Sequence, residues 1–480
     1  MANTVSQPLR WLLALGLSVL LFRLMSLGFY PLYDTTEARY GEIARIMLET
    51  GNWVTPQFDY NIPFWGKPPF QTWISGASFG IFGVNEFAAR LPHFLCNLVT
   101  LGIVYRFAKQ TIGKQRAIYS VIVLSACIGF TITAGTVMTD SALLMATTLA
   151  MTSYWRCYIG DNRTQNGLLF FAALSLGMLI KGPVAVVIIG IALVTWSISQ
   201  RCFIKALSAL PWFKGMGLFL ALTLPWYIWA EIRSPGFFEY FIIGEHIQRF
   251  LVSGWQGDLY GTAHKEPRGM IWIFWLAGAF PWSFLLITRF FKAGIHEVQR
   301  RQSQPKNPLT SYLCCWMLAP LFLFTMSGNI LPAYVLPGIA AMGLLTALLI
   351  TSQRVLAAMA IVSYALLVSA ISWVLLGKVS KKTEKSLLSN HIEQVQDTPL
   401  YYWKKRPFSA QFYSKGHAKL ITDGEILKQQ LLANDEFYIA IAHTDKQEVE
   451  QSLVNQCSTI ERTSERILLH CRQPTEEGMQ

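Results

Sequence analysis

Apolar segments long enough to cross a membrane recur along most of this chain. Runs of about 18 residues, the length that spans a bilayer as a helix, follow one another from Leu9 to residue 377. A lipid environment leaves exposed backbone polar groups unsatisfied, so such runs fold as helices that pack together. Only 14% of the 480 residues are charged, about half the share in a soluble domain. The sequence therefore predicts a polytopic α-helical membrane protein.

We expect about 11 transmembrane helices, and short or split helices would raise the number to about 13. The first run is too long for a signal-peptide core and lacks a small-residue cleavage site, so it is expected to be retained. The expected spans cover residues 9–28, 87–107, 116–133, 137–157, 167–180, 183–199, 215–231, 269–290, 309–326, 330–350 and 355–377.

The distribution of Lys and Arg in the short loops predicts the orientation. Basic residues concentrate in alternate loops, which places the N-terminus on the cytoplasmic side. Two longer loops, 31–86 and 232–268, then lie on the outer side. An odd number of spans places the C-terminal segment outside as well.

The sequence divides into a membrane domain, 1–377, and a C-terminal domain, 378–480. The second part is charged and contains the alternating apolar stretches 436–441 and 466–470, which indicate strands mixed with helices and thus a small soluble α/β domain. Its Cys457 and Cys471 could form a disulfide if this domain is extracytoplasmic.

The net charge of +12 resides in the membrane part, because acidic and basic residues nearly balance in the tail. This excess fits the positive-inside bias, and it also fits attraction to lipid headgroups or to a phosphate substrate. The basic residues are scattered between spans and form no stripe, which argues against nucleic-acid binding.

The first outer loop combines carboxylates and a cation near the membrane surface. Asp34, Glu37 and Arg39 surround the start of an expected helix over 36–49, and a second helix is expected over 70–82. Carboxylates here are costly unless they are solvated, paired or functional. The alternative interpretation is an interfacial helix held by ion pairs.

Further ionisable residues recur at the same expected face. Lys67 precedes two prolines in an aromatic stretch, which suits a lipid-linked phosphate, although its side chain could also reach lipid headgroups. Asp140 at the mouth of an apolar helix is a functional candidate or a helix N-cap. Lys181 lies between two spans, and His246 and Arg249 lie in the second long loop.

A polar break, 327–337, separates two late spans and is bounded by prolines. Such breaks are tolerated in membranes where they line a cavity.

Taken in order, these segments resemble the bacterial dolichyl-phosphate-mannose–protein mannosyltransferase-like branch of the GT-C glycosyltransferases, and within it the lipid A aminoarabinose transferases. The matching segments, which span about residues 1–350, are 37–44, 67–69, 85–92, 139–140, 181–183, 245–250 and 331–337.

The resemblance implies a GT-C fold and an enzyme that transfers a sugar, with inversion, from a polyprenyl (undecaprenyl) phosphate donor. The acceptor would be lipid A or another cell-envelope glycan, at the periplasmic face of the bacterial inner membrane. A protein acceptor, as in the O-mannosyltransferases, is the alternative within the family. The family has an adjacent Asp-Glu pair in the first loop, but Thr36 occupies the Asp position here. The catalytic base therefore stays open between Asp34, Glu37 and Asp140.

The resemblance also implies binding roles. Relatives that modify lipid A carry a Glu before the Lys that matches Lys67, where Gly66 stands here, so we expect no metal. No other cofactor is expected, because the lipid phosphate is already a good leaving group, and we expect a monomer. The implied phosphate-binding residues are Lys67, Arg39, Arg249, His246 and Lys181, and the implied substrate-cavity residues are Tyr40, Trp65 and Tyr334.

Two other classes of protein fit the sequence less well. A transporter or flippase would keep its charged groups near the bilayer midplane within repeated halves, whereas here they gather at one expected surface and no repeat is visible. A scaffold or sensor would account for the tail but not for the clustered carboxylates and cations.

Overall fold

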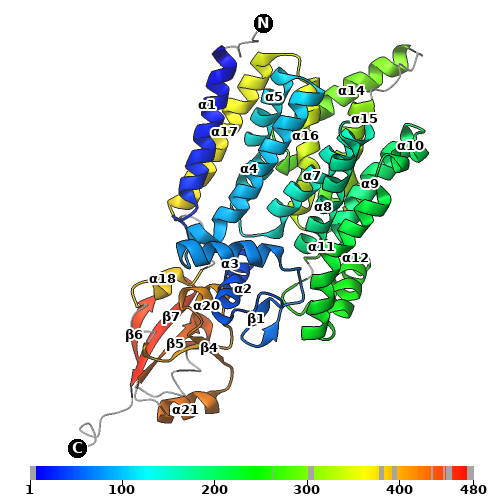
Figure 1. Ribbon diagram of the computed structural model, residues 1–480. Coiled ribbons are helices and arrows are strands. Elements are labelled where there is room, and N and C mark those ends of the chain that lie inside the picture. The colour runs from blue at the N-terminus through cyan, green and yellow to red at the C-terminus, as the bar shows by residue number, and fades with distance from the viewer. Residues whose placement is uncertain are drawn as a thin grey trace, which may run out of the picture. The chain divides into compact units, whose positions relative to one another are not determined.

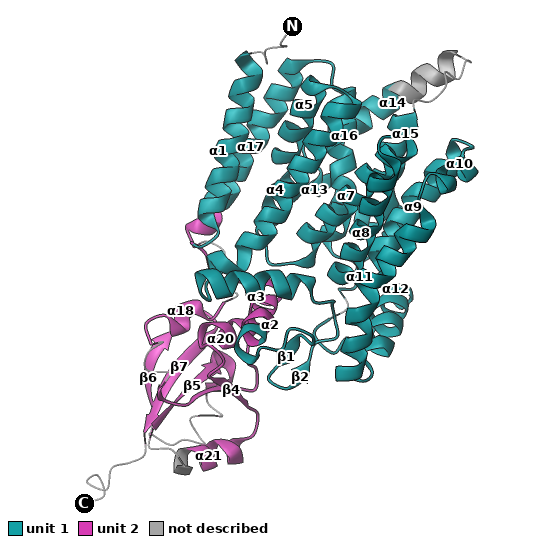
Figure 2. Ribbon diagram, in the orientation of Figure 1, with its two compact units in different colours: residues 1–28, 47–372 teal, residues 29–46, 373–480 magenta. Residues whose placement is uncertain are grey.

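The computed structural model of the protein is mostly helical (Figure 1). The chain forms two compact units, which are coloured separately in Figure 2. The first contains residues 1–28 and 47–372, and the second contains residues 29–46 and 373–480. The structure describes residues 7–262, 264–300, 308–377, 383–391, 397–433, 436–446, 449 and 457–472.

The first unit is a bundle of long and short helices (Figure 1). A small hairpin of two strands, β1 (Gln57–Asp59) and β2 (Ile62–Pro63), precedes α3. The helices are α1 (Gln7–Ser26), α3 (Phe70–Phe82), α4 (Glu86–Thr111), α5 (Lys114–Ser125), α6 (Ile128–Thr133), α7 (Thr139–Tyr158), α8 (Arg163–Lys181), α9 (Pro183–Ser199), α10 (Phe203–Ser208), α11 (Trp212–Arg233), η1 (Glu239–Gln248), α12 (Arg249–Leu251), α13 (Met270–Gly278), α14 (Trp282–Arg300), α15 (Pro308–Thr325), η2 (Pro332–Gly338), α16 (Ile339–Leu349) and α17 (Gln353–Leu375).

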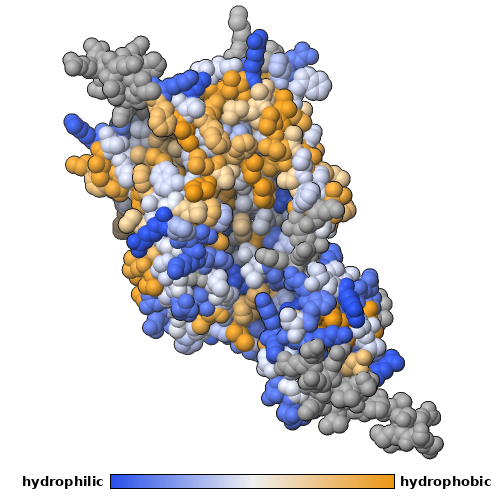
Figure 3. All heavy atoms as spheres, turned by 180° about the vertical axis from the view of Figure 1, so that it is seen from behind, coloured by the Kyte–Doolittle hydropathy of each residue, from blue (hydrophilic) through white to orange (hydrophobic). Residues whose placement is uncertain are grey.

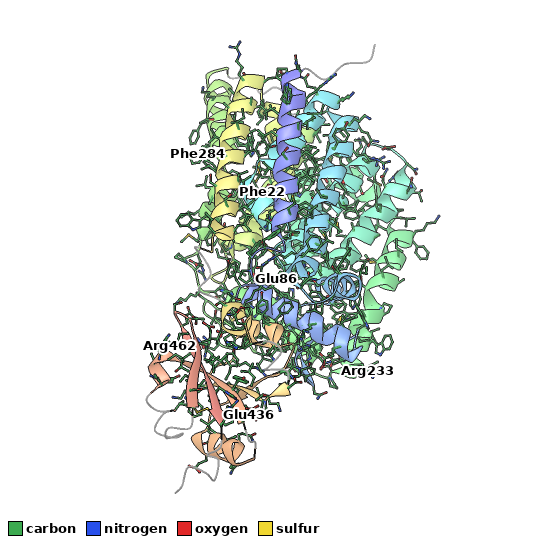
Figure 4. All side chains as sticks on the ribbon, turned by 90° about the vertical axis from the view of Figure 1, so that its left-hand side faces the viewer. Phe22, Glu86, Arg233, Phe284, Glu436 and Arg462 are labelled. Carbon is green, nitrogen blue, oxygen red and sulfur yellow. A yellow bond between two sulfur atoms is a disulfide. The ribbon has the colours of Figure 1, made fainter. Side chains whose placement is uncertain are left out.

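Apolar side chains both fill the bundle and cover its outside. The core includes three tryptophans, Trp196, Trp282 and Trp316, that are almost completely buried. Many other large apolar side chains are exposed, and apolar residues cover much of the helical surface in Figure 3. Phe22 and Phe284 lie along the helices in Figure 4, and Phe284 is 57% exposed. A surface of this kind requires a lipid environment.

Six described helices are individually long and apolar enough to cross a membrane, or seven if the bent pair α13–α14 forms one span. This is fewer than the 11 to 13 expected from the sequence. The expected span 116–133 is broken into α5 and α6, and the expected span 269–290 bends by 111° between α13 and α14. Pro281 lies at that bend and cannot continue the hydrogen bonding of α13. Hydropathy alone did not reveal either break.

The second unit contains a five-stranded mixed sheet with the strand order β4-β3-β5-β7-β6. Strand β3 pairs in parallel with β4 and β5, whereas β7 pairs antiparallel with β5 and β6. Glu436 at the start of β5 and Arg462 at the end of β6 mark opposite ends of the sheet (Figure 4). The strands are β3 (Leu400–Trp403), β4 (Ala418–Ile421), β5 (Glu436–Ala442), β6 (Cys457–Arg462) and β7 (Arg466–Arg472), and the short helices are α18 (Lys385–Leu388), α20 (Phe408–Tyr413), α21 (Gly424–Ala433) and η3 (His443–Asp445).

These elements confirm the α/β character predicted for the tail, including the strands expected over 436–441 and 466–470. Cys457 and Cys471 are directly opposed on β6 and β7 and form a disulfide, with their Cα atoms 4.0 Å apart. The pairing left open by the sequence is therefore present in the structure.

The first-loop segment 29–46 belongs to the same unit as the tail, which the sequence did not indicate. Helix α2 (Thr36–Thr50) begins within this segment and matches the helix expected over 36–49, as α3 matches the one expected over 70–82. The backbone N–H of Leu32 donates to the Tyr413 hydroxyl at 2.8 Å. Phe412 packs close to Gly41. Contacts from α20 thus hold the segment to the C-terminal domain.

Candidate functional site

A cavity of about 430 Å³ opens in the first unit and combines a charged end with apolar walls. The apolar part comes from side chains of α9, η1 and α15. The charged and polar part consists of Lys67, Lys181, Glu245, His246, Arg249 and Tyr334. Five of these six residues were predicted to be functional from the sequence, and the structure brings them together around one space.

Lys67 reaches the cavity from a rigid turn before α3. The two prolines that follow it restrict the backbone. A Cβ atom on Gly66 would lie 2.9 Å from the Phe64 ring and 3.4 Å from the Tyr260 ring. A larger residue before Lys67 would have to displace this aromatic packing.

The first charged cluster in the cavity centres on Glu245. Its carboxylate accepts a hydrogen bond from Lys67 Nζ at 3.0 Å. Nη1 of Arg249 donates to both Glu245 oxygens, at 2.9 and 3.0 Å. Arg249 Nη1 also lies 3.3 Å from the carboxylate of Asp258. Two cations and two carboxylates therefore form one connected network.

The protonation states in this cluster follow from its charges. Burial alone would raise the pKa of Glu245, but the charges of Lys67 and Arg249 lower it to about 2. Burial lowers the pKa of Arg249, and the neighbouring Glu245 more than offsets this, so that the pKa is raised overall. Both residues are thus charged at neutral pH.

The second charged cluster joins Asp140 and Lys181. Lys181 Nζ donates to Asp140 Oδ1 at 2.5 Å, and both side chains are more than 90% buried. The ammonium group also lies 4.3 Å from the centre of the Tyr334 ring, within the range of a cation–π interaction. Asp140 is in the first turn of α7 and Met138 is the N-cap residue, so the N-cap interpretation of Asp140 is wrong.

His246 contacts the backbone with both ring nitrogens. Nδ1 lies 2.7 Å from the Phe241 oxygen, and Nε2 lies 3.2 Å from the Lys181 oxygen. Burial lowers the pKa of His246, while these two carbonyl contacts act in the opposite direction. Gly182 has φ +83°, and a Cβ there would lie 2.6 Å from the Phe241 ring. His246 therefore fixes the end of α8, rather than presenting a free nitrogen to a phosphate.

Asn329 holds the loop that carries Arg249. Its side-chain amide donates to the backbone oxygens of Arg249 and Val252, both at 2.6 Å, and its oxygen accepts from Gly254 N–H at 2.8 Å. Asn329 is 4% exposed. The polar break 327–337 thus anchors the second long loop through three hydrogen bonds from one side chain.

Trp65 was expected in the substrate cavity but is not among the described residues that line it. Its indole N–H donates to Ser234 Oγ at 2.7 Å, and its ring lies 6.0 Å from that of Tyr240. Trp65 therefore packs the Lys67 turn against the end of α11.

Four of the predicted residues belong to the second unit. Both carboxylate oxygens of Asp34 accept hydrogen bonds from Ser409, one from its backbone N–H at 3.1 Å and one from its hydroxyl. Glu37 is 7% exposed and lies in the first turn of α2. The Arg39 guanidinium lies 5.2 Å from the centre of the Tyr40 ring.

Comparison with known proteins gives two kinds of similarity. The dolichyl-phosphate-mannose-protein mannosyltransferase family matches residues 24–241. An undecaprenyl phosphate-alpha-4-amino-4-deoxy-L-arabinose arabinosyl transferase from Erwinia tasmaniensis is 32% identical over 345 residues, which cover 70% of this chain and 59% of the relative. The chain thus aligns with about three fifths of the length of that relative. Both matches agree with the family resemblance inferred from the sequence motifs.

Solved structures share this GT-C fold. The crystal structure of ArnT from Cupriavidus metallidurans bound to undecaprenyl phosphate has a TM-score of 0.79 and 17% identity, and the match covers 96% of this chain and 98% of that one. The archaeal oligosaccharyltransferase AglB from Archaeoglobus fulgidus has a TM-score of 0.51 and 12% identity, with coverage of 91% and 70%. The fold predicted from the sequence is confirmed, including its C-terminal sheet domain.

Three residues of this site were not predicted: Glu245, Asp258 and Asn329. Glu245 and Arg249 are four residues apart, a spacing that brings side chains together on a helix, so their pairing could have been anticipated. The contacts of Asp258 and Asn329 with the Arg249 segment depend on how loops fold back, and no local pattern signals them.

Among the described residues, no group of three or more His, Cys, Asp or Glu side chains could hold a metal ion.

Proposed function

We propose that this protein transfers a sugar from a polyprenyl (undecaprenyl) phosphate donor to lipid A or another cell-envelope acceptor, at the periplasmic face of the bacterial inner membrane. The observation that carries the proposal is the cavity with Lys67, Lys181 and Arg249 at one end and apolar walls beside them. Cations suit a phosphate and apolar side chains suit a prenyl chain.

The same arrangement suits the chemistry of transfer. The acceptor oxygen attacks the anomeric carbon, the bond from that carbon to the phosphate oxygen breaks, and the polyprenyl phosphate leaves with the electron pair. Attack from the side opposite the leaving group inverts the configuration. Negative charge develops on the departing phosphate, where Lys67 and Arg249 stabilise it.

A carboxylate takes the proton from the acceptor hydroxyl. The two oxygens of Asp34 are both engaged by Ser409, so we assign Asp34 to positioning and propose Glu37 or Asp140 as the base. The variants Glu37→Gln and Asp140→Asn distinguish between these two candidate bases. Loss of the base lowers the rate of the chemical step even at saturating donor. Loss of the ion pair between Asp140 and Lys181 would act on donor affinity instead.

The names of similar proteins guide the choice of substrate. The donor to test first is undecaprenyl phosphate-α-4-amino-4-deoxy-L-arabinose, because the Erwinia tasmaniensis relative is named for it. The ArnT structure contains undecaprenyl phosphate, which supports the same carrier. The distribution of basic residues between alternate loops supports the periplasmic location of the site. We propose that the protein acts as a monomer and without a metal.

Mass spectrometry of envelope lipids, glycans and glycoproteins from a deletion strain tests the function. Wild-type protein should restore a sugar modification that Lys67→Ala does not restore, with both present in the membrane at equal amounts. A modification found on protein would replace the lipid acceptor by a protein acceptor. Substrate uptake into vesicles without any glycan product would instead support a transporter and overturn the proposal.

A further inference from the structure

The two cations best placed for the donor phosphate are already bound to a carboxylate. Glu245 contacts Lys67 at 3.0 Å and Arg249 at 2.9 Å, and its side chain is 3% exposed. The Tyr240 hydroxyl also lies 3.4 Å from Glu245 Oε1. The carboxylate is therefore fixed from three directions and faces the space that a phosphate would occupy.

The resident carboxylates balance the charge of the cavity. Lys181 is paired with Asp140, and Arg249 contacts Asp258 in addition to Glu245. Among the described residues, each of the three cations that line the cavity thus contacts at least one of three carboxylates, of which Glu245 also lines the cavity. An incoming phosphate competes with these carboxylates, instead of entering a site with a positive surplus.

Arg249 nevertheless keeps one donor for a ligand. Its Nε is buried and has no hydrogen-bond partner among the described residues, while Nη1 and Nη2 contact Glu245, Asp258 and the backbone oxygen of Thr262. A buried N–H without an acceptor is costly. A phosphate oxygen bound in this cavity would accept a hydrogen bond from this N–H.

We propose that Glu245 is a positioning residue that orders Lys67 and Arg249 in the empty site and competes with the product phosphate for them. The inference rests on the proposed function, because it concerns release of polyprenyl phosphate after transfer. The donor is a phosphodiester with one negative charge, whereas the product is a monoester with a charge of about −1.5 to −2 at neutral pH. Without a competing anion the product would bind more tightly than the donor, and the enzyme would be inhibited by its own product.

Glu245→Gln tests this competition because it removes the charge and keeps the shape. Binding of undecaprenyl phosphate to the full-length protein in nanodiscs should tighten by about tenfold, and product inhibition should strengthen by a similar factor. The KM for the donor should fall less, and kcat should fall because release is slower. The matched control is Glu239→Gln, an exposed residue on the same helix η1, which changes the net charge equally and should leave product binding unaltered.

Glu245→Asp separates charge from geometry. It keeps the anion, so product affinity should stay within about twofold of the wild type, while kcat falls because Lys67 and Arg249 are held less well. If Glu245→Gln does not fold, Asp258→Asn provides the same test. It removes the second carboxylate from Arg249 and should tighten product binding by about threefold.

Unchanged or weaker binding of undecaprenyl phosphate to a folded Glu245→Gln variant would overturn the inference. Failure of the proposed function would look different. In that case the wild-type protein forms no glycan product, although the binding comparison between Glu245→Gln and Glu239→Gln can still be made.

Discussion

Asp34 and Ser409, which are 375 residues apart in the sequence, are joined by two hydrogen bonds that use both carboxylate oxygens of Asp34. The Ser409 hydroxyl also accepts a hydrogen bond from Glu384 N–H at 3.0 Å. Burial raises the pKa of Asp34, and the bonds from Ser409 counteract this. The C-terminal domain therefore fixes the chain just before α2, the helix that carries Glu37, Arg39 and Tyr40.

Ser409→Ala should reduce sugar transfer without affecting the cations of the cavity directly. It removes one of the two bonds to Asp34 and should lower the free energy of unfolding by about 1–3 kcal/mol, because a buried acceptor loses its partner. We expect kcat to fall several-fold in a transfer assay with purified protein. The control is Ser458→Ala on the exposed side of β6, which should match the wild type. Equal kcat values for both variants would show that Asp34 needs no support from the tail.

The contact between Asp34 and Ser409 also shows what the sequence could not supply. The helices at 36–49 and 70–82 and the strands near 436 and 466 were predictable, because periodicity and turn residues mark their ends locally. The association of the first loop with α20 depends on two segments that are distant in the chain. No local sequence pattern indicates a contact between two segments that are so far apart in the chain.

The sequence identified the three cations of the site and Asp140, the carboxylate that pairs with Lys181, but it missed Glu245 and Asp258, the carboxylates that contact Arg249. A charged side chain near the membrane is costly and therefore marks a candidate functional site. The sequence for this reason points to Lys67, Lys181 and Arg249. The sequence does not point to Asn329, because an Asn in a polar break between spans is ordinary. The interruption between α5 and α6 was also missed, because Ala126 and Cys127 stand there and neither residue is a helix breaker.

Lys67→Ala should lower transfer by about a hundredfold, the typical effect of removing one group that stabilises developing charge. The loss should be visible in both KM for the donor and kcat, because the cation acts on the bound phosphate and on the departing one. Lys214→Ala, at an exposed position on α11, is the control and should retain full activity. Steady-state kinetics with membranes containing equal amounts of each variant provide the measurement.

Asn329→Asp should weaken donor binding although Asn329 is not expected to touch the sugar. The substitution replaces the amide that donates to the Arg249 and Val252 oxygens by an oxygen that repels them, at a cost of about 1–3 kcal/mol. Arg249 then loses its fixed position and the KM for the donor should rise about tenfold or more. Asn61→Asp, on the exposed β1–β2 turn, is the control. An unchanged KM would indicate that Glu245 and Asp258 suffice to hold Arg249.

Removal of divalent cations should leave the activity unchanged. The packing of Gly66 against Phe64 and Tyr260 leaves no room for an additional carboxylate next to Lys67 without rearrangement, and we propose that cationic side chains alone neutralise the phosphate. Transfer rates measured before and after dialysis against a chelator provide the test. A loss of activity that is restored by one particular divalent cation would refute this part of the proposal.

Glu384 should make the stability of the C-terminal domain depend on pH. Burial raises the pKa of Glu384 from 4.5 to about 7, with Arg466 lowering it and Asp34 raising it, and the Tyr402 hydroxyl also contacts this carboxylate. Between about pH 4.5 and pH 7 the folded domain retains a proton that the unfolded chain has released. Stability therefore falls as the pH rises through this window, by up to about 3 kcal/mol.

Thermal unfolding of the full-length protein in nanodiscs between about pH 5 and pH 8 tests this dependence. Glu384→Gln should flatten the decrease in unfolding temperature with pH, because its amide does not titrate and resembles the neutral carboxyl of the wild type at low pH. Glu465→Gln, exposed between β6 and β7, should keep the slope of the wild type. Asp34 faces the same buried cluster. If the unfolding temperatures of the wild type and Glu384→Gln fall with pH at the same slope, another group, and not Glu384, binds the retained proton.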